Sequence, residues 1–168
     1  MTVADSIAEF LADKGITHAF GIIGAGNVAL FEAITRLAKT EIVCCHHEQA
    51  AVMAATFWGR VNGKCGVAIV TTGAGSANAI TGALSAQMDS VPALVISGNE
   101  PSRYLMAKTR VIGVQGFHTA WDVEGFVKRS IQWHGDRTLE QAYDVAISGR
   151  PGPVWIDVPR DYFNEVVN

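Results

Sequence analysis

The sequence predicts an α/β fold, a three-layer sandwich in which a mostly parallel sheet of about six strands lies between helices. Short apolar segments alternate along the chain with segments whose apolar residues recur at helical spacing, and this alternation is typical of parallel sheets. Residues 66–72 (GVAIVTT) are apolar and β-branched almost throughout, which indicates a parallel strand covered on both faces. The chain shows no internal repeat or boundary, so we expect residues 1–168 to form a single domain.

The first third of the chain contains expected helices over 3–14, 28–37 and 48–61 and expected strands over 18–23 and 41–45. The helices are assigned because their apolar residues return every three or four positions. Lys-Gly closes the first helix, basic residues lie near the C-terminal end of the second, and Asn-Gly closes the third. The two strands are the short apolar runs HAFGII and EIVCC.

The middle of the chain contains the strand 66–72, a helix over 73–90 that is rich in small residues, and a strand over 91–98. From residue 99 to about 119 the periodicity fails, and glycines and basic residues mark a long loop. Loops of this length in compact domains are usually functional or disordered, so this segment is a candidate part of the site.

The last part of the chain contains an expected strand over 126–133 (FVKRSIQW) and a final strand over 152–159 (GPVWIDVP). Between them we expect a helix over 138–148 that begins at Thr138 as its N-cap, because threonine is a favoured N-cap residue. These elements complete the alternation of strands and helices on which the fold prediction rests.

Composition excludes several classes of function. Hydrophobic residues make up 49% of the chain and charged residues 17%, which is a globular composition. The formal charge is −3 without a basic block, so we expect no nucleic-acid partner. No apolar run approaches the roughly 18–20 residues of a membrane span, and the acidic N-terminal segment is not a signal peptide. Cys44, Cys45 and Cys65 have no metal-ligand spacing, and we expect a reducing, cytoplasmic setting.

Residues 24–29 (GAGNVA) spell G-x-G-x-x-A between an expected strand and an expected helix. In dinucleotide-binding folds this pattern cradles a pyrophosphate, and Glu48 lies about 20 residues further on, as that fingerprint requires. Two features weigh against this interpretation, because a helix precedes the strand and because Glu48 begins a helix instead of ending a strand. A dinucleotide-binding module stays one hypothesis among three.

More specific patterns occur in residues 46–51 (HHEQAA), in residues 71–78 (TTGAGSAN), which are followed by DSVP, and in GRPGPVWIDVP near the C-terminal end. In this order and spacing they resemble the pyrimidine-binding (PYR) domain of thiamine diphosphate enzymes, in particular the acetolactate synthase group. The GIIGAGN turn matches the glycine turn of that group, and the resemblance covers nearly the whole chain. The sequence departs from the group at Ala74, where Pro is common, at Ala77, where Thr is common, and in the loop around Gln115.

The resemblance implies that Glu48 is the catalytic residue, since a carboxyl group bonded to the cofactor's aminopyrimidine promotes the proton transfer that activates the cofactor. It implies that the following residues line the cofactor site: Gly24, Ala25, Thr72, Gly73, Gly75 and Asn78. Gln115 and His118 are the substrate-side candidates. No metal ligands are expected, because His46 and His47 lack a third ligand at suitable spacing and are interpreted as strand-end packing groups.

The resemblance also implies a partner. Enzymes of this group bind thiamine diphosphate between a PYR domain and a pyrophosphate-binding domain, which carries a Gly-Asp-Gly motif and a later Asn that hold Mg²⁺. The chain has no such motif, since its one Gly-Asp pair, Gly135-Asp136, is followed by Arg137. We therefore expect a partner subunit with this motif to hold Mg²⁺, in a hetero-oligomer that is at least a heterotetramer. The partner's docking site should be an exposed apolar patch.

The first hypothesis is thus the PYR subunit of a split thiamine diphosphate enzyme that decarboxylates a 2-oxo acid and joins the product to a second carbonyl compound. A subunit of a simple 2-oxo acid decarboxylase, similar to the sulfopyruvate decarboxylases, is the alternative within the class. The second hypothesis is a catalytically idle scaffold or regulatory subunit, and the third is the dinucleotide-binding module. The limits of the chain favour a natural subunit, although an excised domain would look the same.

Overall fold

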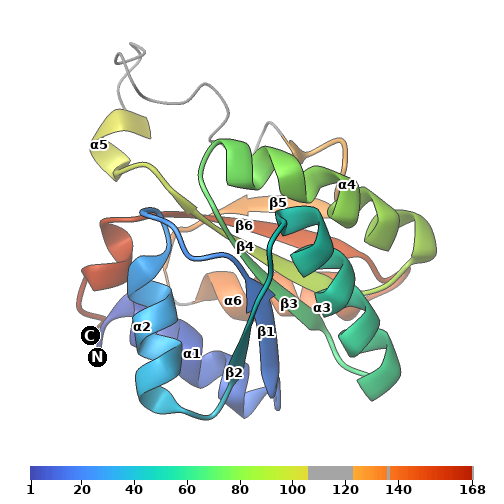
Figure 1. Ribbon diagram of the computed structural model, residues 1–168, viewed down its shortest axis with the longest axis horizontal. Helices are drawn as coiled ribbons and strands as arrows, with labels where there is room; N and C mark the ends of the chain where they lie inside the picture. Colours follow the sequence, from blue (N-terminus) through green and yellow to red (C-terminus); the bar gives the residue numbers. More distant parts are fainter. Residues whose placement is uncertain (106–122, 136, 168) are drawn as a thin grey trace.

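Six strands form one sheet in the computed structural model, which describes residues 1–105, 123–135 and 137–167 (Figure 1). The sheet order is β2-β1-β3-β4-β6-β5, and every neighbouring pair is parallel. The strands are β1 (His18–Gly21), β2 (Glu41–Cys44), β3 (Gly66–Thr71), β4 (Ala93–Asn99), β5 (Arg129–Gln132) and β6 (Pro153–Pro159). The predicted α/β sandwich is confirmed, and the sheet is parallel throughout.

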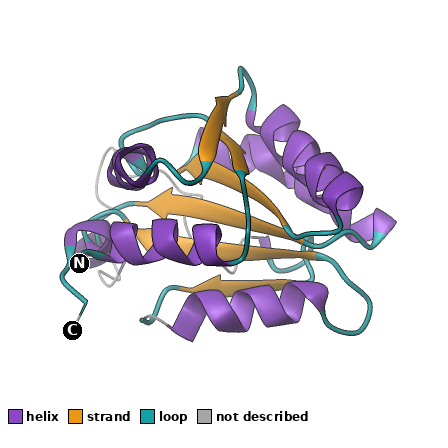
Figure 2. Cartoon of the chain, turned by 90° about the horizontal axis from the view of Figure 1, so that it is seen from below, coloured by secondary structure: helices purple, strands orange, loops and turns teal. Residues whose placement is uncertain are grey.

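Helices cover both faces of this sheet (Figures 1 and 2). One face carries α1 (Val3–Asp13), α2 (Val28–Leu37) and α6 (Arg137–Ile147), and the other carries α3 (Glu48–Asn62) and α4 (Ala74–Asp89). Two short helical segments, α5 (Ser102–Leu105) and the 3₁₀ turn η2 (Tyr162–Asn164), complete the described elements. None of the helices in the described ranges has the length and apolar character that crossing a membrane requires.

The strands divide the core into two parts by the alternation of their side chains. On β3, Val67 and Ile69 are buried with α1, α2 and α6, whereas Ala68 and Val70 are buried with α3 and α4. Successive side chains of a strand point to opposite faces, so a strand between two helical layers must be apolar at every position. This requirement explains why residues 66–72 form a continuous apolar run, from which a strand covered on both faces was predicted.

Two sequence expectations need correction. Helix α6 begins at Arg137, so Thr138 is not its N-cap but a fully buried residue of its first turn. There the Thr138 hydroxyl accepts a hydrogen bond from the His134 backbone N–H (3.2 Å) and lies 2.7 Å from His134 Nδ1. The expected irregular segment is regular at its start, because β4 extends to Asn99 and α5 follows it.

The two ends of the described chain lie side by side (Figure 1). The Val3 N–H donates to the Glu165 carbonyl (2.9 Å), and the Val167 N–H donates to the Met1 carbonyl (3.0 Å). Thr2 and Val166 thereby form an antiparallel bridge outside the main sheet.

Candidate functional site

The candidate site lies at the edge where the parallel strands end, because parallel strands present all their carboxyl ends to the same edge of a sheet. The glycine turn 24–26 follows β1, the turn 72–73 follows β3, and α3 begins at Glu48 after β2. The β1, β2 and β3 strands are neighbours, so segments separated by up to about 50 residues in the sequence meet there.

A buried asparagine shapes the glycine turn. Asn27 is fully buried and precedes α2. Its Oδ1 accepts from the Gly24 N–H (2.8 Å), and its Nδ2 donates to the Ile22 carbonyl (3.0 Å). Ala25 lies exposed at the tip of the turn. The predicted turn is therefore confirmed, and its polar groups are satisfied within the protein.

Three glycines pack around Thr71, the last residue of β3. The Gly26 N–H donates to Thr71 Oγ1 (3.2 Å). A Cβ at Gly24 would lie 2.8 Å from the Thr71 side chain, and one at Gly75 would lie 2.9 Å from Thr71 Cγ2. Any larger residue at these glycines would displace Thr71, so the glycines serve close packing between the two turns.

Gly26 also touches a second strand end. A Cβ at Gly26 would lie 2.5 Å from the Gly98 carbonyl oxygen, and a Cβ at Gly98 would collide with the Gly26 carbonyl. The glycine turn thus rests on the ends of both β3 and β4. Contact with the Thr71 side chain accounts for Gly24, and contact with the Gly98 backbone accounts for Gly26, without a pyrophosphate.

Glu48 is the first residue of α3, and its side chain is 92% shielded, with 8% of the residue exposed. Its Oε2 accepts a hydrogen bond from Asn78 Nδ2 (3.0 Å). Its Oε1 lies over Gly75, since a Cβ there would be 3.1 Å from this oxygen. His47 is the N-cap, and its Nδ1 accepts from the Gln49 N–H (3.3 Å). The helix N-terminus favours the negative charge of the carboxylate.

The turn after β3 needs glycine for a different reason. Gly73 has a φ of +67°, a conformation that side-chain-bearing residues rarely adopt. Thr72 before it faces β4, and its hydroxyl donates to Asn99 Oδ1 (3.2 Å). Asn99 Oδ1 also accepts from the Glu100 N–H (2.7 Å), and Asn99 Nδ2 donates to Asp157 Oδ2 (2.6 Å). A carboxylate only accepts and a backbone N–H only donates, so this amide has one orientation.

The structure brings most of the predicted site residues together. Glu48, Gly75 and Asn78 are in direct contact, and Thr71 connects them to the turn that contains Gly24. The positions of Gln115 and His118 lie outside the described residues. His46 and His47 are exposed, so their interpretation as packing groups is wrong. In the described ranges, no group of three or more His, Cys, Asp or Glu side chains could hold a metal ion.

Sequence reasoning missed Thr71, Asn99 and Asp157. Thr71 precedes the predicted Thr72, and only the packing of three glycines around it reveals its importance. Asn99 and Asp157 are 1% and 2% exposed at the ends of β4 and β6. A polar residue at the end of an apolar parallel strand is the signal that could have identified both, because such a side chain needs a buried partner.

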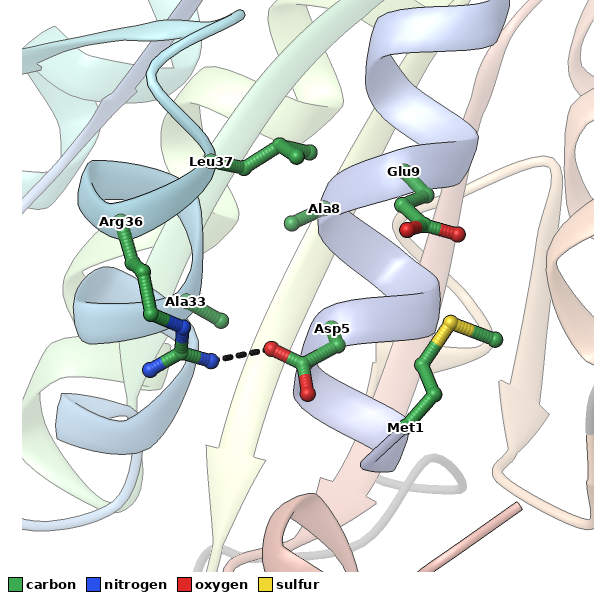
Figure 3. A pocket seen from close by; sticks show the side chains of 7 residues that line it. All are labelled: Met1, Asp5, Ala8, Glu9, Ala33, Arg36 and Leu37. Atoms are coloured by element: carbon green, nitrogen blue, oxygen red, sulfur yellow. Dashed lines mark hydrogen bonds and ion pairs between the residues drawn. The ribbon is translucent and has the colours of Figure 1, made fainter.

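A separate cavity between α1 and α2 is less suited to chemistry (Figure 3). Figure 3 shows Arg36 of α2 reaching across to Asp5 of α1, where the two side chains form an ion pair. Ala8, Ala33 and Leu37 supply most of the remaining wall. Asp5 and Arg36 pair with each other, and the cavity lies on the α1–α2 face, away from Glu48 of α3.

The fold and the site together define a cofactor-binding α/β domain in which glycine turns surround a buried glutamate at a helix start. The profile of the family described as "Thiamine pyrophosphate enzyme, N-terminal TPP binding domain" matches residues 1–137. The chain belongs to this family.

Relatives of known function agree with this assignment. The chain is 36% identical over 170 residues to the acetolactate synthase large subunit of Haemophilus influenzae, which covers 96% of this chain and 28% of that protein. It is 36% identical over 167 residues to the chloroplastic acetolactate synthase of Arabidopsis thaliana, covering 94% of this chain and 24% of that protein. It is 35% identical over 162 residues to the acetolactate synthase isozyme 2 large subunit of Escherichia coli K12, covering 96% and 29%. The chain thus spans 24% to 29% of the length of these relatives, and it resembles their PYR domain.

Proposed function

We propose that this chain supplies the pyrimidine-binding half of a thiamine diphosphate enzyme that acts on a 2-oxo acid by decarboxylation and carboligation. The observation that carries the proposal is the buried Glu48 carboxylate, which has one oxygen held by Asn78 and the other placed over the bare Gly75. Oε1 accepts no hydrogen bond from the described residues, so a ring nitrogen of a ligand could bond to it. The residues present therefore fit the pyrimidine of the cofactor.

Each site residue has a defined part in this proposal. Glu48 holds a proton at Oε1 and exchanges it with a ring nitrogen of the pyrimidine, which is general acid–base work. Gly24 and Gly75 let the two turns pack closely around Thr71, and Gly73 supplies the positive-φ turn before α4, so the ring would lie against the backbone of these turns. When bound, thiamine diphosphate supplies the nucleophilic carbon that attacks the 2-oxo acid. Ala25 at the exposed tip of the glycine turn lies where the rim of the cofactor cleft would be.

The polar residues differ in what they can offer a ligand. Thr72 donates its one hydroxyl proton to Asn99, so toward a ligand Thr72 acts as a hydrogen-bond acceptor. We assign Gln115 and His118 to the substrate side, as in the sequence-based hypothesis. The carbonyl group that accepts the second carbon fragment is proposed to lie on that side.

A partner subunit would complete the site. We propose that it carries the pyrophosphate-binding domain and holds Mg²⁺, because the described residues provide no cluster of metal ligands. Its docking site would be the α3–α4 surface, which we define as Met53, Phe57, Val61, Leu84 and Met88. These residues are 39%, 68%, 68%, 37% and 71% exposed, and Met53 and Phe57 line a cavity of about 160 Å³ between the two helices.

The α3–α4 surface belongs to the same helix pair as Glu48 and Asn78. A partner that covers it would therefore reach the candidate site, and a pair of such complexes gives a heterotetramer. We place the complex in the cytoplasm, where three free thiols persist. Burial raises the pKa of Cys65 to about 12, so this thiol is unreactive.

The Glu48→Gln variant tests the proposed function. In the complex isolated with its partner, we expect Glu48→Gln to lower the rate of 2-oxo acid consumption by roughly 10²–10⁴-fold, because Gln cannot exchange the proton. Glu32→Gln, an exposed acid on α2, is the matched control and should leave the rate unchanged. Full activity of Glu48→Gln would refute the catalytic assignment and favour an idle scaffold.

Product analysis with pyruvate tests the reaction type. Carboligation gives acetolactate or acetoin, whereas a simple decarboxylase releases free aldehyde. Release of aldehyde as the main product would replace the synthase proposal by the decarboxylase alternative. Titration of the chain with NAD or FAD should give no binding at micromolar concentration, and binding would favour the dinucleotide hypothesis instead.

A further inference from the structure

The two oxygens of the Glu48 carboxylate have different surroundings. Oε2 accepts the hydrogen bond from Asn78 Nδ2 at 3.0 Å. Oε1 faces Gly75 and accepts no hydrogen bond from the described residues. The carboxyl group can therefore meet a ligand through one oxygen while the protein holds the other.

Helix geometry explains how one short segment controls both oxygens. Gly75 and Asn78 lie three positions apart on α4, so they occupy one face of that helix, one above the other. This face meets the first turn of α3, where Glu48 is fixed by the start of the helix. The missing side chain of Gly75 lets Oε1 lie close to α4, and Asn78 gives Oε2 its donor.

We propose that Asn78 is a positioning residue that acts through Glu48, and that it does not act as a direct cofactor contact. This inference rests on the proposed function and replaces the cofactor-binding part that the family resemblance implies for Asn78. The bond to Oε2 fixes the rotation of the carboxyl group and leaves Oε1, which lies beside Gly75, as the oxygen that accepts no hydrogen bond from the described residues. The same bond leaves Oε1 as the carboxyl oxygen that meets a ligand.

An amide is suited to this position because it can serve both protonation states of its neighbour. Its N–H₂ donates to a carboxylate, and after a rotation its carbonyl accepts from a carboxylic acid. An aspartate at the same position would instead add a second negative charge next to Glu48. His47, which precedes Glu48 in the sequence, carries a titratable side chain. Asn78 and Gly75, the two residues of α4 that contact Glu48, carry no titratable group.

A double-mutant cycle separates positioning from direct contact. The variants Asn78→Ala, Glu48→Ala and the double variant are compared in the complex isolated with its partner, by titration with thiamine diphosphate and Mg²⁺ and by kcat. We expect Asn78→Ala to weaken cofactor binding about tenfold when Glu48 is present. In the Glu48→Ala background it should have no further effect, because nothing remains to be positioned. Asn62→Ala, at the far end of α3, is the matched control.

Two outcomes overturn the inference while the proposed function stands. One is an equal loss from Asn78→Ala in both backgrounds, which indicates a direct ligand contact. The other is wild-type behaviour of Asn78→Ala while Glu48→Ala is impaired. The proposed function fails if Glu48→Ala itself binds the cofactor and turns over substrate like the wild type. Failure of the inference about Asn78 and failure of the proposed function can therefore be distinguished.

Asn78→Asp provides a second measurement that does not depend on the alanine variant folding. The added carboxylate disfavours ionisation of Glu48, so the acidic limb of the pH–rate profile should move to higher pH, with activity restored as pH rises. A structural role alone would lower the rate at all pH values equally. In the isolated chain, the side-chain amide resonance of Asn78 should shift in Glu48→Ala and stay constant in Glu32→Ala, and an unchanged resonance in both would contradict the contact.

Discussion

At Gly26 and Gly98 the backbones of two distant segments touch, and this contact determines the shape of the site edge. The glycine turn can lie on the ends of β3 and β4 only because neither glycine carries a Cβ. Thr71 is enclosed in the same way by Gly24 and Gly75. The absence of side chains at four positions is therefore as important to the site as the carboxylate of Glu48.

We predict that Gly98→Ala strongly destabilises the chain, because its Cβ would overlap the Gly26 carbonyl and the two strand ends would have to separate. The expected loss is about 1–3 kcal/mol or more in the free energy of unfolding, measured by urea denaturation. Gly125→Ala is the control, because a Cβ there would meet nothing within 4 Å. Equal stability of the two variants would contradict the close contact.

At the level of single residues, prediction from the sequence succeeded where neighbouring residues in the chain determine the role of a residue. The glycine turn and the start of α3 at Glu48 follow from turn and helix-start signals, and the structure confirms both. The part played by Thr71 could not be predicted, because it depends on a contact between two turns. Asn99 and Asp157 stand out as polar residues in apolar strands, but their pairing across the sheet could not be predicted. Buried polar pairs between strands leave no periodic signal in the sequence.

Among the elements, α1 has the most complete start signal. The Thr2 hydroxyl accepts from the Asp5 N–H (3.2 Å), and Asp5 Oδ2 accepts from the Thr2 N–H (2.9 Å), which is a capping box. Arg36 of α2 pairs with the same carboxylate, so one aspartate both starts α1 and joins α1 to α2. The hydrogen bond from the Thr2 backbone is the main cause that lowers the pKa of Asp5, and Arg36 adds to it.

We predict that Asp5→Ala lowers the free energy of unfolding by about 0.5–2 kcal/mol at pH 7. The folded-state pKa of Asp5 is lowered, so its stabilisation is complete above the unfolded value near 3.9 and is lost as pH falls through the folded value. The difference between wild type and Asp5→Ala, measured by urea unfolding, should therefore shrink in acid. Glu9→Gln, on the same helix, is the control, and a difference that is constant with pH would argue against the ionised cap.

Element prediction was limited by tertiary context. The alternation of strands and helices was predicted correctly, because apolar period reflects burial directly. Helix α5 was not predicted, since four residues contain too little periodicity. Thr138 was placed outside α6 because threonine suits a cap, yet its hydroxyl bonds to His134 within the core.

At the scale of the whole molecule, the two helical faces differ in what they leave exposed. The α1–α2 face carries the Asp5–Arg36 ion pair, whereas the α3–α4 surface presents five large apolar side chains to solvent. Large apolar side chains exposed together on one pair of helices are typical of interaction sites. This difference indicates the face on which a partner would bind.

We predict that Phe57→Glu abolishes co-purification of the partner subunit and lowers self-association of the isolated chain, because the variant puts a charge in the centre of the α3–α4 surface. Ile147→Glu, at a 45% exposed position on α6, is the matched control and should change neither. Affinity purification and analytical ultracentrifugation measure the two effects. Retention of the partner by Phe57→Glu would locate the interface elsewhere.

The two ends of the described chain are hydrogen-bonded to each other, and this pairing makes the domain suitable for circular permutation. Since residues 1–3 and 165–167 pair directly, a short linker could join the termini without disturbing the sheet. New termini could then be opened at the exposed Ala38–Lys39 turn, which lies before β2 on the edge opposite the site. Such a circular permutant would begin shortly before β2 and Glu48 and would carry the glycine turn 24–26 close to its C-terminal end.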